Sequence, residues 1–357
     1  MFLINVYLGL QNVKSAKPLK QSGLPFVAVL VPFRNEAKNI PRLVESLKNQ
    51  TYPKTHLQII LIDDASDDGS YELAEKIIPE NFLLIKSSQG GERAFKKKAI
   101  EQGLKFAHAE IILTTDADCV HQSEWVETVV SYFDEETGVV SAPVAFENEN
   151  TLFAKLQKLE FAGLVLVGAG LIGAGKPIIA NAANFAYRKR AFDAVDGYED
   201  NKHLSSGDDE ILMQKIASRT AYKIKFAWNL LAVVKTTANE SVSKFAEQRK
   251  RWASKGLFYF DKTIIALLFF IFLFYLSLVG LFIAAFFGLS FKWFLYLFAM
   301  KSLIEYFVVK EGADFLFEKS LLKYFLIAEI VQIPYVVFAA VAGAFGNYEW
   351  KGRKVKR

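Results

Sequence analysis

Apolar and polar residues follow two different patterns along this chain, and each pattern predicts a different kind of structure. Through most of the chain, short apolar runs are closed by polar or turn-forming residues, with stretches of helical spacing between them. Strands are expected at 26–31, 57–62 and 111–115, and helices at 39–50 and 94–107. This alternation of strand and helix predicts an α/β domain with a mostly parallel sheet.

Long apolar stretches replace this pattern toward the C-terminus. Residues 264–289 contain no charged residue, and about 20 apolar residues are enough to cross a membrane as a helix. Residues 321–345 form a second stretch that we expect to span, although polar residues and a proline interrupt it. The stretch 291–309 carries Lys301 and Glu305, which could pair on one helical face. It could either span the membrane or lie in the interface.

The two patterns together predict five consecutive regions. They are a hydrophobic anchor remnant and linker at 1–24, the α/β domain at 25–240, an interfacial segment at 241–262, a transmembrane region of two to three helices at 263–346, and a basic tail at 347–357. The N-terminal apolar run is too short to span a membrane by itself.

Composition and charge exclude several classes of protein. With 52% hydrophobic residues and 32 Phe, the chain is not a disordered protein. The single cysteine, Cys119, excludes an internal disulfide and a cysteine-based zinc site. The net charge of +5 arises at the end of the chain, where five of the last seven residues are Lys or Arg. No basic groove for nucleic acid is therefore predicted, and the tail should favour the cytoplasmic side of a membrane.

Three acidic clusters interrupt the α/β pattern. They are Asp63 with Asp64, Asp116 with Asp118, and Asp208 with Asp209. The first two follow predicted strands, and ligands of open α/β sheets bind beyond the carboxyl ends of the strands. Gathered carboxylates repel each other unless a cation or a donor compensates, so a divalent metal ion or a specific ligand is expected there.

Each cluster also has a simpler interpretation. Asp67, Asp68 and Gly69 suit an ordinary turn better than a calcium-binding loop beginning at Asp64, because a strand precedes them. Asp208 and Asp209 could cap a helix. The four histidines are scattered and show no ligand spacing; only His203 lies near an acidic cluster.

The order and spacing of the motifs are more specific than any one of them. The set comprises VPFRNE (31–36), IDDASDDGS (62–70), TDADC (115–119), ANAANFAYRKRAF (180–192), SGDDE (206–210) and QRKRW (248–252). Over about residues 25–260 it resembles the membrane-bound glycosyltransferases of family 2, which include cellulose, hyaluronan and poly-N-acetylglucosamine synthases. The resemblance implies the GT-A nucleotide-diphospho-sugar transferase fold, an α/β fold, followed by C-terminal transmembrane helices.

The resemblance also implies a donor site. Asp64 should contact the nucleoside, and Pro32, Arg34 and Glu36 should line the same pocket. Lys96 should lie near the nucleotide, although the neighbouring Lys97 and Lys98 leave that register open. Asp116 and Asp118 match the DxD motif, which implies donor-diphosphate binding partly through Mg²⁺ or Mn²⁺.

On the acceptor side, the resemblance implies that Asp209 is the general base, while Asp208 serves helix capping or support. Four residues of QRKRW, namely Gln248, Arg249, Arg251 and Trp252, match an element linked with the diphosphate and the acceptor. The segment with Asn181 and Asn184 should approach the sugar and the acceptor. The apolar stretch 160–180 should face the acceptor or form a helix buried against the bilayer.

These expectations describe an inverting glycosyltransferase in the inner or plasma membrane, with a cytoplasmic catalytic domain. Its partners would be a nucleotide-sugar donor, expected to be a UDP-sugar, a lipid or glycan hydroxyl acceptor, the membrane and possible accessory subunits, but not nucleic acid. A processive β-glycan synthase is an alternative. A non-catalytic membrane receptor that binds a nucleotide or a metal is an alternative of another class. An enzyme that makes activated sugars would need a glycine-rich basic loop after the first strand, which VPFRNEAKN is not.

Overall fold

The computed structural model describes residues 1–18, 23–87, 95–147, 150–204, 206–345, 348–350 and 353–355. The helices are α1 (Phe2–Ser15), α2 (Ile40–Lys48), α3 (Ser70–Ile77), α4 (Phe95–Leu104), α5 (Trp125–Val130), α6 (Leu152–Gly173), α7 (Lys189–Asp193), α8 (Glu210–Arg219), α9 (Val242–Ser254), α10 (Lys262–Ala285), α11 (Lys292–Lys310) and α12 (Phe325–Phe345). The strands are β1 (Val27–Phe33), β2 (Leu57–Asp63), β3 (Phe82–Lys86), β4 (Ile111–Thr114), β5 (Thr137–Ser141), β6 (Val144–Phe146), β7 (Phe185–Arg188), β8 (Lys223–Phe226), β9 (Val234–Thr236), β10 (Tyr348–Trp350) and β11 (Arg353–Val355).

The chain forms two compact units, which are described separately. The sheet unit comprises Leu8–Glu147 and Val167–Thr237. The helical unit comprises Met1–Tyr7, Asn148–Leu166 and Ala238–Arg357. The predicted basic tail belongs to the helical unit; apart from the backbone of β10 and β11, it lies outside the described residues.

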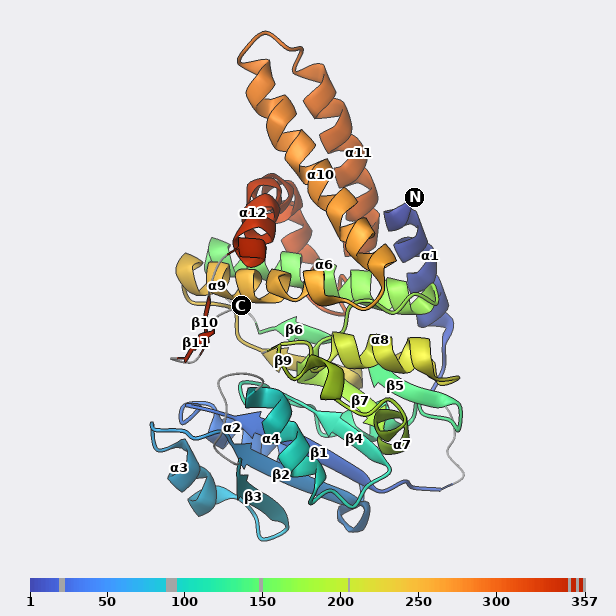
Figure 1. The fold of residues 1–357 in the computed structure, drawn as a ribbon, viewed down its shortest axis with the longest axis vertical. Coiled ribbons are helices and arrows are strands. Elements are labelled where there is room, and N and C mark those ends of the chain that lie inside the picture. The colour runs from blue at the N-terminus through green and yellow to red at the C-terminus, as the bar shows by residue number, and fades with distance from the viewer. Residues whose placement is uncertain are drawn as a thin grey trace. The chain divides into compact units, whose positions relative to one another are not determined.

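The sheet unit is built on a seven-stranded sheet in the order β3-β2-β1-β4-β7-β5-β8 (Figure 1). The three strands predicted from apolar runs are confirmed as β2, β1 and β4, which are adjacent and parallel. β7 runs antiparallel to both of its neighbours, β4 and β5. The α/β fold class is thus confirmed, with a mixed sheet in which the parallel strands β2, β1 and β4 supply one continuous carboxyl edge.

Helix α4 packs closely on this parallel part of the sheet, as Figure 1 shows. The close approach depends on Gly103, because a Cβ atom there would lie 2.9 Å from Cδ1 of Ile62 in β2. Leu30 of β1 lies under the same position at 3.3 Å. A side chain at position 103 would have to displace the end of the Ile62 side chain, so glycine lets α4, which carries Lys96 in its first turn, lie close to the strands.

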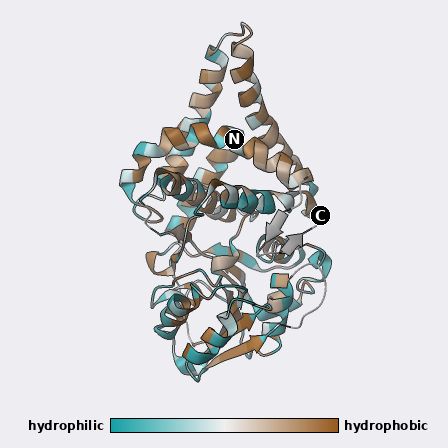
Figure 2. Cartoon of the chain, turned by 90° about the vertical axis from the view of Figure 1, so that its left-hand side faces the viewer, coloured by the Kyte–Doolittle hydropathy of each residue, from teal (hydrophilic) through white to brown (hydrophobic). Residues whose placement is uncertain are grey.

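In the helical unit, α10 and α11 run side by side as a hairpin along which apolar residues predominate (Figures 1 and 2). α12 packs on α9, and Figure 1 views it nearly end-on, across the direction of the hairpin. Among the residues that the structure describes, three helical stretches are long and apolar enough to cross a membrane, namely Leu152–Gly173, Lys262–Ala285 and Lys319–Phe345. The first is 61% buried inside the protein, against 17% and 22% for the others, so α10 and α12 are the better candidates to face lipid.

Lys301, which interrupts the apolar pattern of α11, is buried at the centre of a polar cluster. Its Nζ lies 2.8 Å from Oε2 of Glu305, 2.6 Å from Oε2 of Glu329 and 2.7 Å from Oε1 of Gln332. Tyr275 of α10 donates its hydroxyl to Gln332 at 3.1 Å. The predicted pairing of Lys301 with Glu305 is confirmed, and the cluster joins α10, α11 and α12 through one ammonium group.

Candidate functional site

The carboxyl ends of β2, β1 and β4 bring three of the predicted site segments to one edge of the sheet. Asp64 follows β2, Arg34 follows β1, and Asp116 lies two residues beyond the end of β4. These strands are adjacent and parallel, so the segments that follow them emerge together. The sequence predicted this edge as the ligand site, because open α/β sheets bind ligands there.

Lys96 joins two of the acidic clusters into one site. Its Nζ lies 2.5 Å from Oδ1 of Asp116 and 3.2 Å from Oδ2 of Asp208. The contact between Lys96 and Asp208 is an ion pair whose atoms are not aligned as a hydrogen bond. Burial alone would lower the pKa of Lys96, but the carboxylates of Asp116 and Asp208 outweigh it and raise that pKa well above its usual value. Lys96 is therefore a permanent cation at the end of β4.

The adjacent lysine has a different environment, which resolves the register that the sequence left open. The Lys97 side chain is buried and donates to the backbone carbonyls of Asn201 and Leu204, at 2.7 and 2.9 Å. It ties α4 to the segment before α8. Lys97 therefore supports the fold, and Lys96, which contacts Asp116 and Asp208, stays the lysine predicted to lie near the nucleotide.

Asp208 and Asp209 have separate environments at the start of α8. Gly207, with a φ of +86°, turns the chain in a way that a side chain would hinder. Asp209 then caps the helix, its Oδ1 accepting from the N–H of Glu210 at 2.6 Å and its Oδ2 from the N–H of Ala182 at 2.9 Å. The helix cap is therefore Asp209 and not Asp208, which instead faces Lys96. The pKa of Asp208 is lowered: burial would raise it, and the charges of Lys96 and Lys97 outweigh burial.

A short path of hydrogen bonds links Asp209 to the end of β4. The Ala182 carbonyl accepts from the hydroxyl of Thr114 at 3.2 Å, and the next carbonyl, of Ala183, accepts from Thr115 at 2.8 Å. Asp209 is therefore held against the same strand end that carries Asp116. The sequence did not reveal this link, because backbone carbonyls give no signal in a motif.

Of the two asparagines in this turn, Asn184 is fully engaged in the fold. Its side chain is buried, accepts from the Trp125 indole at 2.9 Å, and donates to two carbonyls, those of Pro143 at 2.7 Å and Ala232 at 2.8 Å. The Asn181 side chain accepts from the N–H of Ala183 at 3.0 Å and is half-buried. Asn181 is thus the better candidate to approach a sugar.

The predicted nucleoside segments are joined to each other by side chains. Arg34 donates from Nη1 to the carbonyl of Asp64 at 2.9 Å and also to that of Ala65. Asn35 and Ala65 both have positive φ, at 52° and 57°, a conformation that is strained outside glycine and clusters at functional sites. Pro32 is buried within β1, and Glu36 accepts from Asn39 at 2.6 Å. Arg34 therefore supports the loop that presents Asp64.

His121 lies beneath this edge, although its sequence position gave no sign of a role. Its ring contacts two hydroxyl groups, Thr115 at 2.8 Å and Ser46 at 3.1 Å, and lies 4.2 Å from the Trp125 ring. Burial lowers its pKa from 6.5 to about 3, so it is neutral under the site. His203, the histidine nearest to an acidic cluster in the sequence, is exposed.

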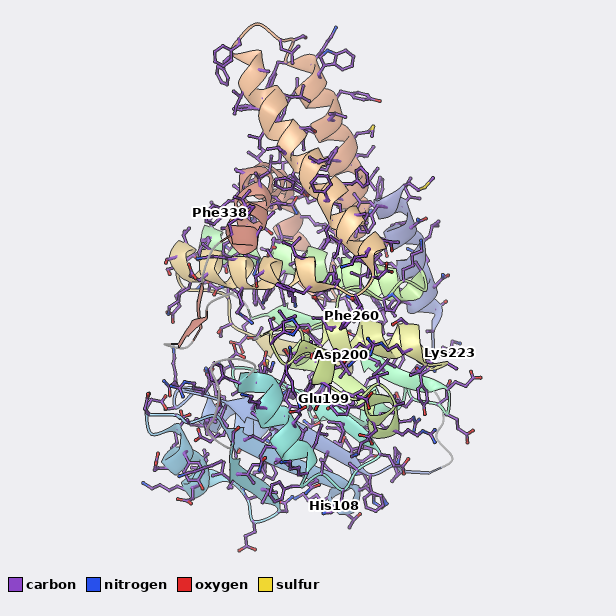
Figure 3. The ribbon with its side chains drawn as sticks, viewed as in Figure 1. His108, Glu199, Asp200, Lys223, Phe260 and Phe338 are labelled. Carbon is purple, nitrogen blue, oxygen red and sulfur yellow. The ribbon has the colours of Figure 1, made fainter. Side chains whose placement is uncertain are left out.

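We expect His121 to make the sheet unit sensitive to acid. The native ring resists the proton that the unfolded chain binds, so its contribution to stability is complete above about pH 6.5 and decreases as the pH falls toward 3. At pH 5 the loss is about 2 kcal/mol, at about 1.4 kcal/mol per pH unit. Unfolding free energies at pH 7.5 and 5 should show this difference, and His121→Gln should reduce it. The control His108→Gln alters an exposed ring, labelled in Figure 3, and should leave the slope unchanged.

The remaining predicted residues lie on α9, in the helical unit. Arg249 is buried and paired with Glu160 of α6, and Gln248 accepts from Arg249 at 2.5 Å. Arg251 and Trp252 are half-buried. Glu160 had a signal that could have been used: a lone carboxylate within an apolar stretch needs a cation partner when buried.

The side chains at the end of β4 suit a hard divalent cation only in part. Asp116 is 38% exposed and Asp118 is half-buried, so their oxygens can take part in binding. Among the described residues, no group of three His, Cys, Asp or Glu side chains is arranged to hold a metal ion. Two carboxylates fit Mg²⁺ or Mn²⁺ when a ligand supplies further oxygens, as is usual for Mg²⁺ at phosphates.

Comparison with known proteins identifies the family. Residues 28–196 match the family described as glycosyl transferase family 2. The chain is 30% identical over 215 residues to glycosyltransferase AglE of Haloferax volcanii, covering 59% of this chain and 67% of that protein. It is 27% identical over 237 residues to a poly-beta-1,6-N-acetyl-D-glucosamine synthase of Staphylococcus aureus, covering 64% of this chain but only 54% of the synthase.

The fold agrees with this family. The mannosyltransferase PcManGT from Pyrobaculum calidifontis, solved in complex with GDP-Man and Mn²⁺, superposes with a TM-score of 0.58 at 18% identity, covering 96% of this chain and 94% of that one. The α/β domain thus has the GT-A nucleotide-diphospho-sugar transferase fold. The chain belongs to glycosyltransferase family 2.

Proposed function

We propose that this glycosyltransferase moves a sugar, with inversion, from a nucleoside-diphosphate sugar to a hydroxyl of a lipid or glycan at a membrane. The observation that carries the proposal is the site at the end of β4, where Lys96 joins Asp116 to Asp208. Asp209, the next residue, is held against the same strand end through Ala182. A cation for a diphosphate and a carboxylate for a hydroxyl proton are the two groups that sugar transfer needs.

Each of these groups has a defined task in the proposal. Lys96 stabilises negative charge on the departing diphosphate, and Arg251 is a further donor for phosphate oxygens. Asp209 accepts the proton of the attacking hydroxyl as general base. Asp208 is ion-paired with Lys96 and so is not available as a second nucleophile. A single displacement, which inverts the anomeric centre, follows from this division.

A divalent cation held by Asp116 and Asp118 would act as a Lewis acid that neutralises charge on the departing phosphate. Because two carboxylates leave most coordination positions to other ligands, the cation and the diphosphate should bind together. Support comes from the exposure of Asp116, whose carboxylate already faces one cation, Lys96.

We therefore expect binding of UDP or GDP to depend on a divalent cation. Mutation of a residue that only supports a metal ligand typically lowers metal affinity about 10–100-fold. Asp116→Asn and Asp118→Asn change the proposed ligands themselves, so each should lower nucleotide affinity in the presence of the cation at least as much. Calorimetric titration of each nucleotide with Mn²⁺ and with EDTA measures the effect. The control Asp193→Asn changes an exposed aspartate of α7 that pairs with Lys189. Undiminished affinity in EDTA would remove the metal assignment.

The donor and acceptor are identified by a direct screen. The purified protein is supplied with UDP- and GDP-sugars, Mg²⁺ or Mn²⁺ and a lipid extract, and products are identified by mass. A single addition supports transfer to a lipid or glycan, which we favour because the described residues contain three helical stretches long and apolar enough to cross a membrane, few for a channel. A ladder of products would support the processive alternative, which the similarity to a poly-beta-1,6-N-acetyl-D-glucosamine synthase favours. Nucleotide binding without any transfer would support a receptor instead.

The helical unit supports location in the inner or plasma membrane with a cytoplasmic catalytic domain. α10 and α12 are both long and apolar enough to cross, and α11 lies alongside α10. If α10 and α11 cross as a hairpin while α12, which packs on α9, stays on the cytoplasmic side, the chain returns to its starting side. This route keeps the cationic tail in the cytoplasm. Of the two arrangements that the sequence left open for 291–309, it uses the one in which this stretch spans the membrane, and it leaves 321–345, which we expected to span, on the cytoplasmic side.

We expect a cysteine in place of Val355 to react with an impermeant thiol reagent only after the cells are permeabilised. Five cations in the last seven residues resist translocation. The native Cys119 is buried, so the background should be small. A cysteine in place of the exposed Phe287, between α10 and α11, should instead react in intact cells. Labelling at position 355 in intact cells would reverse the assigned topology.

A further inference from the structure

Arg249 of the QRKRW segment points into the helical unit and forms a buried ion pair. Its Nε lies 3.1 Å from Oε1 of Glu160 on α6, and its Nη2 contacts Oε2 of the same carboxylate. Only 5% and 9% of the two side chains are exposed. A two-pronged contact of this kind fixes the plane of the guanidinium as well as its position.

That plane lies between two aromatic rings of α9. The Arg249 guanidinium carbon is 4.4 Å from the ring centroid of Phe245 and 4.4 Å from that of Trp252. Positions 245, 249 and 252 are spaced by four and three, so the three side chains share one face of the helix. The Trp252 ring also meets Phe161 of α6, with centroids 6.0 Å apart. The indole is thus held between a fixed cation and a neighbouring ring.

The ion pair also lies within a longer chain of polar contacts. The Glu160 carboxylate accepts from the hydroxyl of Tyr335 on α12. On the other side, Gln248 Oε1 accepts from Arg249 and, at 2.9 Å, from Asn239. Tyr335 of the candidate membrane helix α12, which also packs on α9, is therefore linked to Arg249 of the QRKRW segment through the Glu160 carboxylate.

We propose that Glu160 is a positioning residue for sugar transfer, which holds Arg249 and, through it, sets the Trp252 indole for the acceptor. Tyr335 completes the contact from α12. The proposal rests on the proposed function in one respect, namely that Trp252 meets the acceptor. In this proposal Arg249 pairs with Glu160 and orients Trp252. The motif had instead linked Arg249 with direct binding of the diphosphate.

A simpler role for the pair would be stability alone, and the variants must separate the two. Removing one partner leaves a buried charge without compensation, so Glu160→Gln alone could fail to fold. The double variant Glu160→Met with Arg249→Met replaces both charges by apolar side chains, an exchange that buried ion pairs often tolerate. Glu247→Gln is the matched control, because it breaks the partly exposed contact of Glu247 with Lys250 on the same helix.

The experiment measures acceptor KM, donor KM, kcat and thermal stability for the wild type, the double variant and the control. It also measures acrylamide quenching of Trp252, taken as the difference between each protein and its Trp252→Phe derivative. We expect the double variant to keep near wild-type stability and a near wild-type donor KM. Its acceptor KM should rise roughly tenfold, since misplacement of a group by about 1 Å can cost about 10²-fold in rate. Acrylamide should quench the fluorescence of Trp252 at least twofold more in this variant than in the wild type. The control should change none of these.

A double variant with wild-type acceptor KM and wild-type quenching would overturn the positioning role. If the wild type itself transfers no sugar, the proposed function fails, and the quenching comparison still decides whether the ion pair sets Trp252. Increased quenching with an unchanged acceptor KM would overturn the link to the acceptor.

Discussion

Asp209→Asn is expected to abolish sugar transfer while donor binding remains close to normal. The amide keeps the shape of the carboxylate but cannot accept the proton of the attacking hydroxyl. General-base assistance is typically worth about 10²–10⁴ in rate, and a loss of at least that size is expected in kcat. The measurement is single-turnover transfer at saturating donor, combined with nucleotide affinity for the same variant.

The cap geometry adds a second effect to this substitution. Both carboxylate oxygens of Asp209 accept backbone N–H groups, from Glu210 and Ala182. An asparagine offers only one acceptor oxygen, so one of these donors is left unpaired at a cost of about 1–3 kcal/mol. A moderate decrease in thermal stability should therefore accompany the kinetic loss. It must be measured so that unfolding is not mistaken for loss of the base.

Asp208→Asn is the matched comparison, because the neighbouring carboxylate has the same size and a different partner. Asp208 holds Lys96 at 3.2 Å and makes no cap. Its loss should weaken donor binding more than kcat, since Lys96 would keep only the Asp116 partner. A dead Asp208→Asn with normal donor affinity, or an Asp209→Asn that transfers at the wild-type rate, would refute the assignment of the base.

Lys301→Met is expected to destabilise the helical unit by about 3–5 kcal/mol, the usual cost of removing one partner of a buried ion pair. Lys301 is the cation that compensates the carboxylates of Glu305 and Glu329, and its side chain is 2% exposed. In a membrane these carboxylates would also lack water to solvate them. Chemical unfolding of the purified protein in detergent measures the effect.

Two further variants test whether the ammonium itself is responsible. Lys292→Met removes a lysine from the exposed start of α11 and should change stability little. Combining Lys301→Met with Glu305→Gln and Glu329→Gln removes the uncompensated charges and should restore most of the loss. If Lys301→Met alone is as stable as the wild type, this cluster does not hold α10, α11 and α12 together.

The long strands could be predicted from sequence because each buries a continuous apolar run. β1 and β2 have seven residues each, and both were found, as was β4. β7, which like β4 has four residues, was missed because its sequence, Phe-Ala-Tyr-Arg, is not a continuous apolar run. It lies within a motif that was interpreted for its asparagines, and its antiparallel pairing depends on strands distant in the chain.

The acidic residues of the site could also be predicted, but not their partners. Three consecutive lysines gave no means of choosing Lys96, because the choice depends on which face of α4 meets the sheet. Arg249 and Glu160 are 89 residues apart, and no local pattern shows that they meet. Motif residues are visible in a sequence, whereas the contacts that orient them depend on packing between distant segments. The other predicted roles, including those of Gln248 and Arg251, stay predictions.

The strand order has a consequence for synthesis of the protein. β4 is made early, yet the neighbour that covers its second edge, β7, begins at Phe185, and β8 completes the sheet only at Phe226. A nascent chain released before that point would expose an unpaired apolar strand edge, which favours aggregation. The strongly apolar α10 begins later, at Lys262. The order of the elements therefore allows the sheet to close on the ribosome before the first strong membrane-directing helix is made.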